Sequence, residues 1–197
     1  SYRVMVRISE EGYWIGEEAK NEHLYDEELG KALLQFFKKE QAKNLCDLGC
    51  GMGHYVRHFR ESGISCDGFD GNPDTPTLTQ NTCQVLNLAK PHAFNTPYDW
   101  VLSLEVGEHI PKAYEKIYLE NLHRNNRYGV VLSWGVKGQV GYGHVNCQNN
   151  DYIKEIFAKL GYTNEKEEEL LLRQSATYWW YKHTLMVFRK QFLAAWI

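Results

Sequence analysis

Residues 44–53 constrain the fold of this 197-residue chain more than any other segment. They read Asn-Leu-Cys-Asp-Leu-Gly-Cys-Gly-Met-Gly, which is typical of a buried strand followed by an acidic residue and a glycine-rich turn. Glycines let the backbone approach a ligand and adopt positive φ, and a helix expected over residues 54–62 would offer the free N–H groups of its first turn. The pattern therefore indicates a loop that holds a nucleotide cofactor.

The spacing of these glycines separates one class of cofactor from another. A dinucleotide-binding loop follows the pattern G-x-G-x-x-G, but His54 stands where its third glycine would be. The chain has instead an acidic residue, Asp47, followed by G-x-G-x-G. NAD is therefore disfavoured.

This pattern resembles the first motif of the class I S-adenosylmethionine-dependent methyltransferases, and the resemblance extends from about residue 26 to residue 190. Asp70 ends a second expected strand about 20 residues beyond the glycine turn, where Rossmann-like folds hold the ribose. A third expected strand, 83–88, and a fourth, 99–105, match the family's strands beside adenine and the reactive methyl group. The resemblance implies S-adenosylmethionine as cofactor. The residues it implies for cofactor binding are Asp47, Gly49, Cys50, Gly51, Gly53, Asp70, Gly71, Asn72, Asn87, Leu88, Leu104 and Glu105.

The implied fold is α/β, a Rossmann-like, doubly wound and mostly parallel seven-stranded sheet with an antiparallel last strand. Periodic patterns predict helices over 26–39, 111–125, 149–160 and 165–173, and strands over 128–136, 177–181 and 184–189. We expect one methyltransferase domain over 1–197: a cap segment and helix in 1–40, the cofactor-binding core in 41–190 and a tail in 191–197.

Composition excludes several classes of partner. A hydrophobic content of 43% supports one α/β core, while 22 basic against 25 acidic residues provide no basic field for a long nucleic acid. No apolar run approaches the ~20 residues that span a bilayer, and the polar start is unlike a signal peptide. Five cysteines show no C-x-x-C pair, which suits reduced thiols. We therefore expect a cytoplasmic protein that contacts no membrane.

Candidate catalytic residues follow the fourth expected strand. Glu105, Glu108 and His109 have the i, i+3, i+4 spacing of one helix face, and His144 lies in the loop after the neighbouring fifth strand. The set is similar to that of metal-dependent 2′-O-methyltransferases of small RNAs, and its first part to ubiquinone-biosynthesis O-methyltransferases. The resemblance implies that these four residues hold a divalent metal that binds the acceptor hydroxyl. Mixed carboxylate and imidazole ligands favour Mn²⁺, Fe²⁺, Co²⁺ or Zn²⁺ over Mg²⁺.

Other interpretations of these residues stay open. Without a metal, His109 or His144 would be a general base, and the enzyme would methylate a small amine or side chain. As an alternative to binding the cofactor, Asp47 would only cap the helix that follows it, and Asp70 would only be a turn residue. A third interpretation is a non-catalytic subunit with a cofactor fold. The intact glycines and acidic residues favour an enzyme over such a subunit. The resemblance to the metal-dependent enzymes implies that it methylates an oxygen of a small or terminal acceptor.

Aromatic residues are expected around the mouth of the site. Tyr13 and Trp14 precede the first helix, Trp134 ends the fifth expected strand, and Gln139 and Tyr142 lie in the loop that follows. An aromatic wall would suit a flat or cationic acceptor, although Tyr13 and Trp14 equally suit a core.

Overall fold

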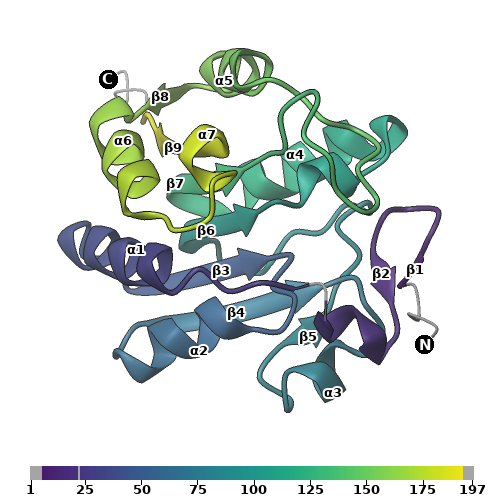
Figure 1. Ribbon diagram of the computed structural model, residues 1–197. Helices are drawn as coiled ribbons and strands as arrows, with labels where there is room; N and C mark the ends of the chain where they lie inside the picture. The colour runs from purple at the N-terminus through teal and green to yellow at the C-terminus, as the bar shows by residue number, and fades with distance from the viewer. Residues whose placement is uncertain (1–5, 22, 193–197) are drawn as a thin grey trace.

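A seven-stranded sheet organises the chain, which the computed structural model describes over residues 6–21 and 23–192. The strand order is β5-β4-β3-β6-β7-β9-β8 (Figure 1). The first five strands in this order, β5, β4, β3, β6 and β7, are parallel to one another, whereas β9 runs antiparallel to both β7 and β8. The strands are β3 Asn44–Leu48, β4 Ser65–Asp70, β5 Gln84–Val85, β6 Tyr98–Leu104, β7 Asn126–Ser133, β8 Tyr162–Asn164 and β9 Leu185–Lys190. The predicted sheet with an antiparallel last strand is confirmed.

Helices cover both faces of this sheet (Figure 1). Val131 of β7 packs into a core cluster with α1, α2, α6 and α7, while its neighbours Val130 and Leu132 pack against α4 and α5. Successive side chains of a strand point to opposite faces, so one continuous apolar strand builds both cores. The helices are α1 Glu27–Lys39, α2 His54–Glu61, α3 Thr75–Leu78, α4 Glu115–Arg124, α5 Asn150–Lys159, α6 Lys166–Ser175 and α7 Tyr181–Thr184.

The N-terminal segment forms a small separate hairpin. β1 Arg7–Ile8 pairs with β2 Trp14–Ile15, and the 3-10 helix η1 Glu17–Asn21 follows. In Figure 1 this purple hairpin lies on the side toward which the arrowheads of β3 and β6 point. Asn72, in the loop after β4, donates from Nδ2 to the Gly16 carbonyl at 3.0 Å. The hairpin is therefore fastened at the carboxyl ends of the parallel strands.

The first helix, predicted over 26–39, begins after an acidic cap, Asp26. Asp26 accepts a hydrogen bond from Leu29 N on Oδ1 at 3.0 Å, and its Oδ2 accepts from Thr177 N and Tyr178 N at 2.8 and 2.9 Å. One buried carboxylate therefore joins the start of α1 to the segment before α7.

The prediction of a strand over residues 177–181 is wrong. The backbone N–H groups of Thr177 and Tyr178 donate to Asp26 instead of a neighbouring strand, and the next residues form turns that lead into α7. The place beside β9 belongs to β8, which the sequence patterns missed. β8 has only three residues and follows directly after α5, so it carries almost no alternation of its own.

Other boundaries differ by short segments. The helix predicted over 111–125 begins as the 3-10 turn η3 Lys112–Tyr114 and becomes α4 at Glu115. The third strand, predicted over 83–88, is reduced to Gln84–Val85. Among the described residues, no helix has the length and apolar character needed to cross a membrane.

Candidate active site

The glycine loop lies between β3 and α2, and hydrogen bonds to β4 hold it in place. Gly49 N and Cys50 N both donate to the Phe69 carbonyl, at 2.7 and 3.0 Å. Gly51 N donates to Asp70 Oδ2 at 2.9 Å. The three motif glycines have φ of +90°, +54° and +74°, a region in which other L-residues are strained. The loop therefore needs glycine at these positions and leaves the first turn of α2 open to a ligand.

Two acidic side chains flank this loop. Asp70, at the end of β4, receives Gly51 N on one oxygen and Asn72 N on the other, at 2.9 and 3.0 Å. Asp47 is 3% exposed on β3, and burial raises the pKa of its carboxyl well above the usual range. Asp70 thus shapes the loop, while Asp47 places a poorly solvated carboxyl beneath it.

A cavity of about 400 Å³ opens above the loop at the carboxyl ends of the strands. Most residues predicted to bind the cofactor or the acceptor line it: Asp47, Gly49, Cys50, Gly51, Asp70, Gly71, Asn87, Leu88, Leu104, Glu105, His109 and His144. Gly53, Asn72 and Glu108 do not. Gly53 starts α2, Asn72 holds the hairpin, and Glu108 is fully buried behind the cavity wall.

Glu105 directly follows β6, at the end of the strand that lies nearest the cavity. It has a φ of +54°, which is rare for a residue with a side chain. Its backbone N–H donates to Ser133, and its Oε1 accepts from Gln139 Nε2 at 2.8 Å. Glu105 Oε2 is buried with no hydrogen-bond partner among the described residues. Besides Gln139, the Glu105 carboxyl interacts with the carboxyl of Glu108.

Glu108 and His109 lie on the short 3-10 turn η2, Gly107–His109. Glu108 Oε2 accepts from Gly135 N at 2.9 Å, and its backbone carbonyl accepts from Val145 N and Asn146 N, both at 2.9 Å. Glu108 Oε1 and His109 Nδ1 are buried without hydrogen-bond partners in the described part of the chain. The loop after β7 is thereby fastened to the turn after β6.

His144 comes to the same place through this loop. Its Nδ1 lies 3.0 Å from the Gln139 carbonyl, and because a carbonyl can only accept, Nδ1 carries the proton and Nε2 has a free lone pair. One ligand atom each from Glu108, His109 and His144 lies within 4.8 Å of the others. Glu105 is not in this trio, because η2 begins only at Gly107 and the predicted helical face does not extend back to it.

Burial perturbs the ionisation of this cluster. It raises the pKa of both Glu105 and Glu108, and the charge of Glu105 raises that of Glu108 further. Burial, helped by His144, lowers the pKa of His109 to about 4. At neutral pH His109 is therefore a neutral imidazole, the form that accepts a proton or a metal ion.

Comparison with known proteins identifies the family. Residues 21–167 match the family described as "Methyltransferase domain". The chain belongs to this family. With the glycine loop and sheet described above, it is a class I S-adenosylmethionine-dependent methyltransferase. Norajmaline N-methyltransferase from Rauvolfia serpentina is 29% identical over 107 residues, which cover 48% of this chain and 37% of that protein. The match thus spans little more than a third of that relative.

Solved methyltransferases share this fold at low sequence identity. An amino pentose methyltransferase from Micromonospora echinaspora has a TM-score of 0.63 and 12% identity, covering 87% of this chain and 94% of that one. Magnesium protoporphyrin IX methyltransferase from Synechocystis, with bound S-adenosylmethionine, has a TM-score of 0.62 and 16% identity, covering 82% and 78%. The methyltransferase domain of bacterial CtHen1 has a TM-score of 0.59 and 15% identity, covering 83% and 98%.

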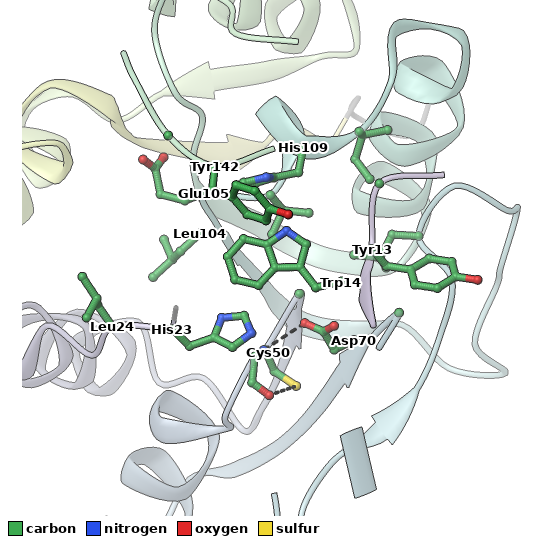
Figure 2. A pocket seen from close by; sticks show the side chains of 18 of the residues that line it. Tyr13, Trp14, His23, Leu24, Cys50, Asp70, Leu104, Glu105, His109 and Tyr142 are labelled. Carbon is green, nitrogen blue, oxygen red and sulfur yellow. Dashed lines mark hydrogen bonds between the residues drawn. The ribbon is translucent and has the colours of Figure 1, made fainter. Parts of the chain in front are cut away.

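In this methyltransferase the N-terminal hairpin closes one side of the cavity. Figure 2 shows the Trp14 indole between His109 and His23. The rings of Trp14 and His23 stack at 4.9 Å, and His109 meets Trp14 edge-on at 5.5 Å. The Tyr142 hydroxyl donates to the Val6 carbonyl. Tyr13, Trp14, Gln139 and Tyr142 therefore border the cavity as predicted.

Trp134 does not border the mouth, and that prediction is wrong. It is fully buried, and its Nε1 donates to the Asn146 carbonyl at 2.8 Å. The sequence also missed several lining residues: Gly12, His23, Met52, Trp179 and Trp180. Met52 lies within the glycine loop itself. The others come from segments with no motif, and only long-range packing brings them to the cavity.

Proposed function

We propose that this methyltransferase transfers the methyl group of S-adenosylmethionine to a hydroxyl oxygen of a small or terminal acceptor, with a divalent metal ion held by Glu108, His109 and His144. The observation that carries the proposal is the convergence of three ligand atoms within 4.8 Å. Two of the three residues, Glu108 and His109, also have a buried polar atom without a hydrogen-bond partner in the described residues. Leaving buried polar groups unpaired costs about 1–3 kcal/mol each. A cation at this point would satisfy them.

The donor set fits a metal ion. One carboxylate oxygen and two neutral imidazoles suit Mn²⁺, Fe²⁺, Co²⁺ or Zn²⁺, and the hydrogen bond from His144 Nδ1 to the Gln139 carbonyl fixes the ring so that Nε2 is available. When bound, the ion would lower the pKa of the acceptor hydroxyl and orient its oxygen. Glu105, which the sequence pattern grouped with these residues, would act as a base instead of a metal ligand.

Glu105 Oε2 would accept the proton of the acceptor hydroxyl. This oxygen is unpartnered in the described part of the chain, Glu105 lines the cavity, and burial raises its pKa, which makes its carboxylate a stronger base. The acceptor oxygen forms a bond to the methyl carbon, and the carbon–sulfur bond breaks with its electron pair going to sulfur. S-adenosylhomocysteine is the product.

The rest of the chain would bind and orient the cofactor. Asp70 would hold the ribose hydroxyls while it keeps Gly51 in place. Asp47 would accept hydrogen bonds from the amino-acid part of the cofactor, whose ammonium would compensate its poorly solvated charge. Asn87 and Leu88 would contact adenine, and Trp14 and Tyr142 would exclude water from the reacting centre.

A second candidate is metal-free methylation of a small amine. It is favoured by the neutral His109 and by the free Nε2 of His144, either of which would take the proton of an ammonium acceptor. The relative from Rauvolfia serpentina is named as an N-methyltransferase, which agrees with this alternative.

Titration calorimetry separates the two candidates. Mn²⁺ is titrated into metal-stripped protein saturated with S-adenosylhomocysteine, using wild type, His144→Ala and, as a control, His183→Ala, which changes an exposed histidine on α7. We expect saturable 1:1 binding that weakens at least roughly tenfold in His144→Ala and is unchanged in the control. Absence of saturable binding to the wild type would refute the metal site and direct acceptor screening from catechols and vicinal diols to amines.

A further inference from the structure

Two buried cysteines lie against each other beneath the glycine loop. Cys50 is the second residue of the loop, and Cys83 immediately precedes β5. Their exposed fractions are 7% and 1%, and both belong to the core cluster on the α1–α2 side of the sheet. The Cys50 thiol donates to the Gly51 carbonyl at 4.0 Å, and the Cys50 side chain lies beside that of Cys83. Neither thiol has a role in the proposed reaction.

A glycine of β4 brings these two cysteines together. A Cβ on Gly68 would lie 2.6 Å from Cys83 Sγ and 3.2 Å from Cys50 Cβ, so both cysteines pack on a bare glycine of β4. Cys46 is in the core cluster on the opposite face of the sheet. Cys66 points its thiol at the Asp67 carbonyl, 3.8 Å away. The pairing of Cys50 with Cys83 is therefore specified by position.

The electrostatic surroundings differ between the two thiols. Interaction with Cys50, together with Arg60, Thr79 and Arg57, lowers the pKa of Cys83. The same interaction and burial raise the pKa of Cys50 well above its ordinary value. Cys83 is thus the more readily deprotonated of the two sulfurs, and the thiolate is the form that attacks oxidised sulfur.

Small oxidants reach the pair through the cofactor cavity. Cys50 lines that cavity, and Figure 2 shows its side chain below Asp70 in the loop. A bound cofactor would lie over the glycine loop and cover this entrance. Occupancy of the cofactor site and oxidation of Cys50 should therefore oppose each other.

We propose that Cys50 and Cys83 form a reversible disulfide that weakens cofactor binding, so that the methyltransferase is switched by peroxide. Cys50, the sulfur that lines the cavity, gives up its proton as it attacks one oxygen of hydrogen peroxide and becomes a sulfenic acid, releasing hydroxide. The Cys83 thiolate then attacks the Cys50 sulfur and displaces a second hydroxide, which gives the disulfide. Two protons from the thiols convert the hydroxides to water, so two thiols and one peroxide give one disulfide and two waters.

The disulfide would act through the loop's own hydrogen bonds. Cys50 N donates to the Phe69 carbonyl and Gly51 N to Asp70, while Phe69 and Asp70 pair with β5, the strand that follows Cys83. Drawing the two sulfurs together therefore shifts the loop and the carboxylate proposed to hold the ribose. The inference depends on the cofactor site alone and is independent of the acceptor and the metal.

The test treats the whole protein with hydrogen peroxide in the presence and absence of S-adenosylhomocysteine. Non-reducing peptide mapping by mass spectrometry should find a Cys50–Cys83 crosslink, and S-adenosylhomocysteine should slow its formation. Calorimetry should show affinity for S-adenosylhomocysteine falling by roughly tenfold or more and returning after dithiothreitol. Cys83→Ala should keep its affinity after peroxide, whereas Cys66→Ala, a matched buried-cysteine control, should lose it like the wild type.

The proposal is overturned if peroxide produces no Cys50–Cys83 crosslink in protein that circular dichroism shows to be folded. It is equally overturned if the crosslink forms and the affinity for S-adenosylhomocysteine does not change. Both outcomes are read on the wild type, so they stand even if Cys83→Ala does not fold.

Discussion

Gln139 donates a hydrogen bond from Nε2 to Glu105 Oε1 at 2.8 Å, which joins the loop after β7 to the carboxylate at the end of β6. The same residue accepts from His144 Nδ1 on its backbone carbonyl. Gln139 thus orients the proposed base with its side chain and a proposed metal ligand with its backbone. Because the carbonyl survives substitution, the two effects are separable.

Replacing Gln139 with Ala should remove the side-chain contact and leave the histidine in place. Glu105 would then have no fixed orientation, and we expect kcat/KM to fall roughly 10–100-fold, with affinity for S-adenosylhomocysteine nearly unchanged. Gln148→Ala, which removes a hydrogen bond to Asn146 in the same loop, is the control and should retain activity. Equal losses in both variants would mean that Gln139 only stabilises the loop.

Asp47→Asn should stabilise the cofactor-free protein and weaken cofactor binding. Burial raises the folded-state pKa of Asp47. Its side chain therefore contributes most to stability below the unfolded-state pKa, where the carboxyl is protonated, and this contribution is lost as the pH rises and the carboxyl ionises. The neutral amide avoids this cost, so we expect a gain of about 0.5–2 kcal/mol at pH 7 and a smaller gain at pH 4.

Thermal unfolding at both pH values and calorimetry with S-adenosylhomocysteine measure these effects. Asp99→Asn is the contrast, because Asp99 is also buried but accepts Lys43 N at 2.8 Å and should lose stability. An Asp47→Asn protein that binds S-adenosylhomocysteine like the wild type would contradict the proposed contact.

Asp26→Ala should destabilise the protein strongly. The change removes the cap of α1 and the acceptor for two N–H groups before α7, and we expect a loss of about 3 kcal/mol in the free energy of unfolding. Denaturant unfolding measures it. Asp74→Ala is the control, because Asp74 precedes α3 without a side-chain cap; a comparable loss there would refute the assignment.

Acid should destabilise the metal-free protein through His109. Its folded-state pKa of about 4 lies below the ordinary histidine value of 6.5, so the unfolded chain binds the extra proton between these values. Its contribution to stability is therefore complete above pH 6.5 and is lost as pH falls toward 4, by about 3 kcal/mol.

The measurement compares wild type with His109→Gln across this range. The difference in the free energy of unfolding isolates His109 from Glu105 and Glu108, whose raised pKa values act with the opposite sign. A difference that stays constant from pH 7.5 to pH 4 would show that His109 is not desolvated in the folded protein.

The site was predictable wherever its residues belong to one local motif. Asp47, the glycines and Asp70 lie at strand ends whose hydrophobic patterns are strong, and the cavity contains them. Glu108 and His109 lie together because they are adjacent in η2. Glu105 was expected on the same face, but a residue with positive φ leaves β6 in a direction that no spacing rule anticipates.

The sequence by itself determined the parallel sheet, the glycine loop and the cofactor class, because strand alternation and glycine's freedom at positive φ are local properties of the chain. Only the tertiary structure decided that His144 faces Glu108, that Trp14 closes the cavity and that residues 177–181 turn instead of extending. Each depends on hydrogen bonds between segments distant in sequence, such as Val145 N to the Glu108 carbonyl and Thr177 N to Asp26. Such contacts form, and stabilise the protein, only when folding brings the distant segments together.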